Sequence, residues 1–145
     1  MGEAFPDFSL LADNEEEMTQ EVLKGVWTVI FFYPKASSPG CTKQACEFRD
    51  LSEEFTDIDA QIIGVSSDSC RAQKSFKKRN GLTFPLLCDK GGILRDSLGV
   101  KSTLGLIAGR ETLVVDPKGI IRDRFNSQLR FKQHARRALK KIRGK

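Results

Sequence analysis

Two cysteines in the first third of the chain, Cys41 and Cys46, are the side chains best placed to do chemistry. Cys41 follows the residues Ser-Ser-Pro-Gly at positions 37–40, which favour a turn and the start of a helix. At such a start the unpaired N–H groups and the helix dipole favour an anion, and the thiolate is the nucleophilic form of cysteine. Cys41 is therefore predicted to be a nucleophile, with an inert packed thiol as the alternative.

Cys46 lies five residues after Cys41, and helix geometry limits what the two thiols can do together. Cα atoms five residues apart in a helix are separated by roughly 8.6 Å, whereas a disulfide needs less than about 7 Å. A bond between them would require the first turns of the helix to unwind, so catalysis would be coupled to local unfolding. The alternative is that Cys46 is a packed core thiol.

Metal and cofactor sites are not indicated by the sequence. The C-x4-C spacing has no second pair, and His134, the single histidine, is distant in the sequence. The sequence also lacks C-x-x-C, G-x-S-x-G, a phosphate-binding loop and G-x-G-x-x-G. We therefore expect no metal and no bound cofactor.

The elements that must position these cysteines follow from the apolar pattern. Residues 27–33 are β-branched and aromatic on both alternating faces, which is typical of a central strand buried in a sheet. A helix is predicted over residues 40–55 and a second buried strand over 61–65. The inward side of this helix is predicted to carry Ala45, Phe48, Leu51 or Ser52, and Phe55. The segment is therefore a right-handed βαβ unit of a three-layer α/β fold.

The remainder of the chain continues the alternation of helices and strands. Helices are predicted over residues 69–79, 92–98 and 129–142, an extended segment over 84–87, and a β-hairpin over 112–122. No repeat or linker divides the chain, so residues 1–145 are expected to form a single domain.

The formal net charge of +5 is concentrated at the C-terminal end. Nine basic residues and no acid occur from Arg124 onward, whereas acids outnumber bases before it. A nucleic-acid-binding surface would use such bases. No base-reading motif accompanies them, so we expect a solvated helix face and no nucleic-acid partner.

The start of the chain and its apolar runs carry expectations about location. No secretory signal is visible, and the longest apolar run, residues 26–33, is far shorter than the roughly 20 residues that span a bilayer. Four cysteines are also too few for a disulfide-stapled mini-protein. We therefore expect a cytoplasmic protein that does not associate with membranes.

Residues 31–50 resemble the active-site segment of peroxiredoxins, and specifically of the peroxiredoxin Q or bacterioferritin-comigratory-protein subfamily. The segment contains P-x-x-x-[TS]-x-x-C as Pro34, Ser38 and Cys41, with the subfamily's second cysteine at Cys46. The resemblance extends to residues 5–10, 63–68 and 110–116. It implies a thioredoxin-like fold, a three-layer α/β/α arrangement with a central mixed sheet.

The resemblance also implies an activity, the thiol-dependent reduction of hydrogen peroxide and organic hydroperoxides. Cys41 would attack the peroxide and become a sulfenic acid, which Cys46 would resolve as an intramolecular disulfide. Thioredoxin or a similar dithiol donor would then reduce that disulfide. A redox-linked chaperone or sensor that uses the same cysteines without turnover is a further alternative.

The same resemblance assigns roles to residues around Cys41. Ser38 would hydrogen-bond the thiolate and the peroxide, Arg110 would stabilise the thiolate and the leaving oxygen, and Pro34 would shield the sulfur from water. Gln44 occupies a position that supports the site. Because Cys46 is present, Cys70 and Cys88 are expected to be bystanders that take no part in the redox reaction. The resemblance also implies that the protein is a monomer.

Overall fold

The computed structural model describes residues 2–36, 38–100, 110–127 and 133–144. Within them, the main sheet has five strands in the order β5-β4-β3-β6-β7. These strands are β3 (Trp27–Phe32), β4 (Ala60–Ser66), β5 (Leu86–Cys88), β6 (Glu111–Val115) and β7 (Ile121–Asn126), and a separate hairpin is formed by β1 (Ser9–Leu11) and β2 (Glu17–Thr19). β3 pairs in parallel with β4 and antiparallel with β6. The predicted central strand and the predicted mixed sheet are thus confirmed.

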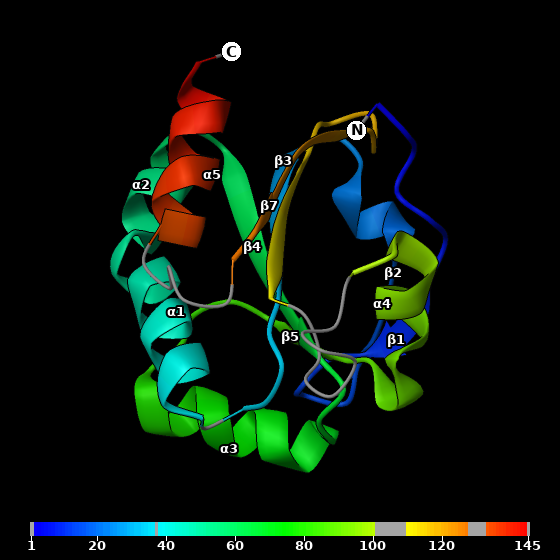
Figure 1. The fold of residues 1–145 in the computed structure, drawn as a ribbon, viewed down its shortest axis with the longest axis vertical. Helices are drawn as coiled ribbons and strands as arrows, with labels where there is room; N and C mark the ends of the chain where they lie inside the picture. The colour runs from blue at the N-terminus through cyan, green and yellow to red at the C-terminus, as the bar shows by residue number, and fades with distance from the viewer. Residues whose placement is uncertain (1, 37, 101–109, 128–132, 145) are drawn as a thin grey trace.

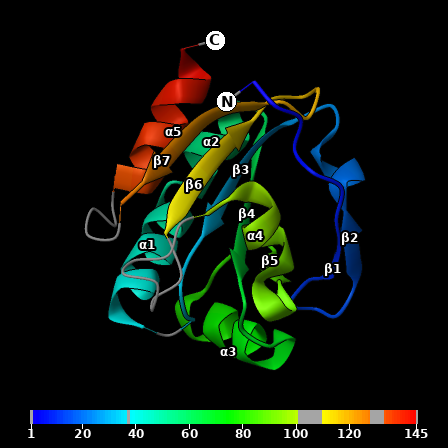
Figure 2. The same ribbon diagram turned by 45° about the vertical axis from the view of Figure 1, so that its right-hand side comes forward.

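Helices cover both faces of this sheet. They are α1 (Pro39–Asp50), α2 (Ser52–Asp57), α3 (Cys70–Asn80), α4 (Ile93–Leu98) and α5 (Gln133–Arg143), with the short 3₁₀ helices η1 (Gln20–Leu23) and η2 (Lys90–Gly92). α1, α2 and α5 lie on one side of the sheet and α4 lies on the other (Figure 1, Figure 2). This arrangement confirms the predicted three-layer α/β/α fold.

The central strand β3 divides the core between the two faces. Val29 and Phe31 belong to a cluster with buried residues of α1, α2, α3 and α5. Ile30 and Phe32 belong to a second cluster with α4 and the N-terminal segment. The ring of Phe31 stacks on that of Phe48 in α1, with centroids 4.3 Å apart. Burial on both faces explains the unbroken apolar run of this strand, and the stacking anchors the middle of α1 on the sheet.

The helix predicted over residues 40–55 is in fact two helices, which corrects the prediction. Leu51 leaves the helical region, with φ −94° and ψ 3°, between α1 and α2. The resulting bend lets Phe48 and Phe55, both predicted on the inward side, reach the same core with ring centroids 6.2 Å apart. α1 alone therefore carries both Cys41 and Cys46.

The β1–β2 hairpin is not predicted from the sequence, because three-residue strands carry no periodic pattern. Its turn covers the edge strand β5. Ala12 forms a bridge with Leu87, and Asp13 makes two hydrogen bonds with the backbone of Leu86, at 2.8 and 3.0 Å. An edge that would otherwise expose unpaired backbone groups is thereby paired.

The other predicted elements are confirmed with small shifts in their bounds. α3 and α4 lie within two residues of their predicted ranges and end at Gly81 and Gly99, both of which have positive φ. α5 buries Ala135, Ala138, Leu139 and Ile142. The predicted start of this helix at residues 129–132 lies outside the described residues. In the described part of the chain, no helix is long and apolar enough to cross a membrane.

Candidate active site

Cys41 lies where β3 gives way to α1, as predicted. It is the third residue of α1, carries a free thiol and is 1% exposed. Ser38 is the N-cap of the helix, and its Oγ accepts a hydrogen bond from the backbone N–H of Cys41 at 3.4 Å. The sulfur thus belongs to the first turn of a twelve-residue helix, where the helix dipole favours an anion.

Ser38 shapes the turn that precedes this helix. Its hydroxyl donates to the carbonyl oxygen of Lys35 at 2.9 Å, in addition to capping the helix. Its own carbonyl oxygen accepts hydrogen bonds from the N–H and the hydroxyl of Thr42, at 2.9 and 2.8 Å. A contact of Ser38 with the thiolate or the peroxide stays a prediction, as does the shielding role of Pro34, which is half-buried at the start of this segment.

Arg110 and Gln44 meet beside the first turns of α1. Gln44 lies one helical turn after Cys41 and is fully buried, and its Oε1 accepts a hydrogen bond from Nη1 of Arg110 at 2.5 Å. Arg110 precedes β6 and is 4% exposed. Nε2 of Gln44 has no hydrogen-bond partner among the described residues. The structure therefore places a buried positive charge next to the turn that bears Cys41.

Two buried residues near Cys41, Tyr33 and Arg95, are not singled out by the sequence. Nη2 of Arg95 in α4 donates to the carbonyl oxygen of Tyr33 at 3.0 Å. Burial lowers the pKa of Arg95, while the charges of two neighbouring aspartates and of Cys41 act in the opposite direction. Burial raises the pKa of the Tyr33 hydroxyl, which donates to Gln73. No motif marks these contacts, because they join elements distant in the sequence.

Cys46 lies one and a half turns after Cys41 and is half-buried with a free thiol. Its Sγ is 3.8 Å from Oδ1 of Asn80 at the end of α3. Because both cysteines belong to the continuous helix α1, the geometric argument from the sequence applies to the structure. The two thiols can bond only after the start of α1 unwinds.

Cys70 and Cys88 form a disulfide bond, a pairing that the sequence does not predict. Their expected role as bystanders of the peroxidase cycle stays a prediction. Their Cα atoms are 5.4 Å apart. The physical reason lies in the β4–α3–β5 unit: Cys88 pairs with Ser66 at the ends of the parallel strands β5 and β4, and α3 begins four residues after Ser66. The carboxyl ends of neighbouring parallel strands meet at one edge of the sheet, so the two sulfurs come together there.

His134 is a structural residue in this fold. Its Nε2 donates to the carbonyl oxygen of Ser127 at 2.8 Å, and its Nδ1 accepts from Oγ1 of Thr112 at 2.7 Å. Burial lowers the pKa of His134 to about 4, and the nearby charge of Arg110 acts in the same direction. In the described ranges, no group of three or more His, Cys, Asp or Glu residues is arranged to hold a metal ion.

Comparison with known proteins assigns the chain to a family. The model of the AhpC/TSA family matches residues 1–124. The chain belongs to the AhpC/TSA family. It is 39% identical to "Peroxiredoxin Q, chloroplastic" of Oryza sativa subsp. japonica over 140 residues, which cover 96% of this chain and 64% of the relative. It is also 39% identical to the protein of the same name in Sedum lineare, covering 96% of this chain and 75% of the relative.

Solved structures agree with this assignment. Peroxidoxin BcpB from Mycobacterium tuberculosis superposes with a TM-score of 0.91 at 35% identity, covering 99% of this chain and 96% of that one. Bacterioferritin comigratory protein of Xanthomonas campestris superposes with a TM-score of 0.88 at 29% identity, covering 94% and 90%. The peroxiredoxin Q resemblance and the thioredoxin-like fold are thus confirmed. The chain nevertheless spans only 64% of the rice relative's length.

Proposed function

We propose that the chain is a thiol peroxidase that reduces hydrogen peroxide and organic hydroperoxides. The thiolate of Cys41 attacks the terminal peroxide oxygen, the O–O bond breaks, and water or an alcohol leaves after taking up a proton. The observation that carries the proposal is the buried free thiol in the first turn of α1, beside the Arg110–Gln44 pair. Arg110 stabilises the negative charge that passes from sulfur to the leaving oxygen.

The second half of the cycle uses Cys46. After the start of α1 unwinds, the Cys46 thiolate attacks the sulfur of the Cys41 sulfenic acid and the S–S bond forms. The S–O bond breaks, and the leaving hydroxide takes up a proton and departs as water. Thioredoxin or a similar dithiol donor reduces the bond and is itself oxidised. Ser38 caps the helix and orients the Cys41 turn, and Pro34 limits access of water. We propose that the enzyme is a monomer and that it is located in the cytoplasm. The rice and Sedum relatives are named chloroplastic.

Two single substitutions test the proposal. In a coupled assay with a dithiol donor system, we expect Cys41→Ser to abolish peroxide consumption. Cys46→Ala should keep one fast oxidation of Cys41 to sulfenic acid but form no disulfide that includes Cys41, as read by mass after alkylation and digestion. Peroxide consumption by Cys41→Ser at the wild-type rate would contradict the proposal. A Cys41–Cys70 bond in the oxidised wild-type protein would contradict the role of Cys46, and oxidation without turnover would favour a redox sensor.

A further inference from the structure

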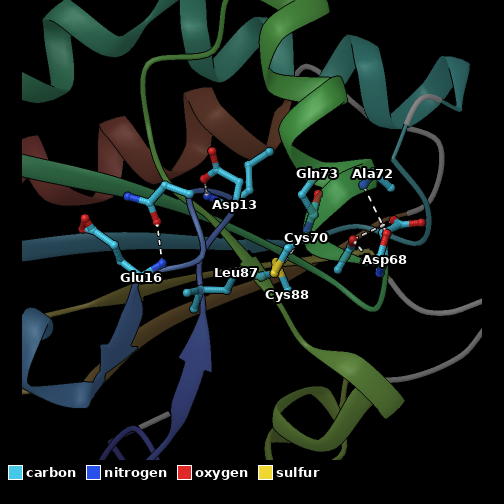
Figure 3. The surroundings of a disulfide bond; sticks show 12 residues. Asp13, Glu16, Asp68, Cys70, Ala72, Gln73, Leu87 and Cys88 are labelled. Atoms are coloured by element: carbon cyan, nitrogen blue, oxygen red, sulfur yellow. Dashed lines mark hydrogen bonds between the residues drawn. A yellow bond between two sulfur atoms is a disulfide. The ribbon is translucent and has the colours of Figure 1, made fainter.

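The disulfide between Cys70 and Cys88 has no part in the proposed peroxidase cycle. It joins the first residue of α3 to the last residue of β5 (Figure 3). Both residues lie at the edge of the sheet where β4 and β5 end, and β3, which leads to Cys41, runs parallel to β4 beside them. The disulfide and the candidate active site therefore lie at the same end of the sheet.

Residues that flank the disulfide hold the segment that leads to Cys41. Asp68, two residues before Cys70, accepts hydrogen bonds from the backbone N–H of Ala36 and from Oγ of Ser66, both at 2.7 Å. Gln73, one turn after Cys70, accepts from the hydroxyl of Tyr33. These hydrogen bonds hold Tyr33 and Ala36, which lie before and after the half-buried Pro34 at the start of the active-site segment.

Gln73 also connects α3, which begins at Cys70, to β5, which ends at Cys88. Its Nε2 donates to the carbonyl oxygen of Leu87, the residue before Cys88, at 2.9 Å. The start of α3, the end of β5 and the end of β3 are thus connected through one buried side chain. Gln73 therefore contacts both segments that the disulfide joins, and Asp68 lies two residues before Cys70.

The disulfide is accessible to a thiol from outside. A cavity of about 480 Å³ is lined by Cys70, Cys88 and Lys90, by the Ser67–Ser69 turn and by strand β1. Cys70 is half-buried, whereas Cys88 is 8% exposed. Access therefore directs an incoming thiolate to the sulfur of Cys70. When released, a Cys70 thiolate lies at the N-terminus of the eleven-residue helix α3, which favours its negative charge.

We propose that Cys70–Cys88 is a second redox site, a disulfide that exchanges with external dithiols through Cys70 and controls how readily the Cys41 segment unwinds. One donor thiolate bonds to the sulfur of Cys70, and the Cys70–Cys88 bond breaks with Cys88 leaving as a thiolate. The second donor thiol then displaces Cys70, and the donor becomes a disulfide. Two electrons and two protons pass to the pair, and an oxidised dithiol donor reverses the reaction.

The direction of the control follows from the contacts. The oxidised pair holds α3 against β5, so Asp68 and Gln73 keep their bonds to Ala36 and Tyr33. The reduced pair leaves these bonds without that restraint, which lowers the cost of unwinding the start of α1. This part of the proposal rests on the peroxidase function, because it concerns formation of the Cys41–Cys46 disulfide.

The exchange itself is tested without the peroxidase cysteines. In the Cys41→Ser/Cys46→Ser protein, we expect dithiothreitol buffers of graded oxidation to convert the remaining pair between dithiol and disulfide in one two-electron step, read by alkylation and mass. In that background, Cys88→Ser should leave a Cys70 thiol that reacts at least tenfold faster with an aromatic disulfide reagent than the Cys88 thiol left by Cys70→Ser. A pair that stays reduced in oxidised buffer, or is reduced only in urea, would overturn the proposal.

The effect of the Cys70–Cys88 bond on unwinding is tested by quenched-flow alkylation of the full-length protein, with Cys41 and Cys46 retained. After one equivalent of hydrogen peroxide, we expect Cys70→Ser/Cys88→Ser to form the Cys41–Cys46 disulfide at least threefold faster than protein with the Cys70–Cys88 bond intact. Ser75→Ala, an exposed substitution in the same helix, is the matched control and should match wild type. Equal rates of Cys41–Cys46 disulfide formation in the double variant and in the protein with the intact bond would overturn the proposal that Cys70–Cys88 controls unwinding. Absence of sulfenic acid at Cys41 would instead defeat the proposed function and leave the exchange result standing.

Discussion

At the scale of single residues, the proposed function gives the buried guanidinium of Arg110 the role of distinguishing Cys41 from an inert core thiol. Its Nη1 donates to Gln44 rather than to solvent, so the charge is held in a fixed place. Preorganised charge of this kind costs no reorganisation when the O–O bond breaks. The Gln44 side chain is therefore a positioning residue for Arg110, and Arg110 is the residue whose loss should affect the chemistry most directly.

We expect Arg110→Met to lower the second-order rate constant with peroxide by about a hundredfold or more, the usual effect of removing one preorganised donor. Arg110→Lys should recover only part of this, because an ammonium group lacks the planar fork of the guanidinium. Stopped-flow rates of Cys41 oxidation provide the measurement. Arg71→Met removes an exposed arginine of α3 and serves as the control, which should react as wild type does. A rate for Arg110→Met within threefold of wild type would exclude the proposed role.

At the scale of elements, the sequence predicts the parts of the site that depend on local order. The apolar run of β3 and the Ser38–Gly40 turn place Cys41 at a helix start, and the structure agrees. The break at Leu51 and the Cys70–Cys88 bond are not predicted. Both depend on which helices and strands pack together, and cysteines eighteen residues apart show no local pattern. The Arg110–Gln44 contact likewise follows only from the fold.

Helix α5 is joined to the sheet by a buried hydrogen-bonded histidine. His134 contacts Thr112 of β6 and the carbonyl oxygen of Ser127, and its ring meets that of Phe125 edge to face. Burial lowers the pKa of His134 from 6.5 to about 4. The folded state thus binds the proton less readily than the unfolded state. Stability from this residue is complete above pH 6.5 and is lost as the pH falls from 6.5 to about 4.

We expect the protonation of His134 to lower the free energy of unfolding of the wild-type protein by about 3 kcal/mol as the pH falls from 6.5 to about 4. His134→Gln keeps an N–H that can donate to Ser127 but cannot titrate, so its unfolding free energy should fall less steeply between pH 6.5 and 4. Urea unfolding at several pH values measures both slopes. Parallel slopes for the two proteins would show that His134 does not titrate as described.

At the scale of the whole molecule, the separation between a basic C-terminal segment and an acidic remainder has a structural meaning. Arginines of α5 pair with acids of α1, α2 and β7. These pairs are Arg136 with Glu47, Arg143 with Glu54, and Arg137 with Asp123, at 2.9 to 3.0 Å. The bases therefore help to dock the last helix on the body of the protein. The pair at Glu47 also joins α5 to the part of α1 just beyond Cys46.

The Arg137–Asp123 pair is the contact through which this docking is best measured. Both carboxylate oxygens accept from the guanidinium, at 2.9 Å each, and the side chains are 48% and 10% exposed. The hydrogen bond to Asp123 raises the pKa of Arg137, which favours its charged form. The guanidinium also lies over the ring of Phe125, 4.9 Å from its centroid. Bidentate geometry and partial burial favour a measurable contribution to stability.

In a double-mutant cycle of Arg137→Met and Asp123→Asn, we expect a coupling free energy of about 1 kcal/mol, reduced at high salt because one partner is half exposed. The Lys24–Glu21 pair, with both side chains more than 60% exposed, provides the matched control and should give a coupling near zero. Urea unfolding of the four proteins of each cycle yields both values. A coupling for Arg137–Asp123 no larger than that of the control would mean that this pair does not help to hold α5 on the sheet, despite its bidentate geometry.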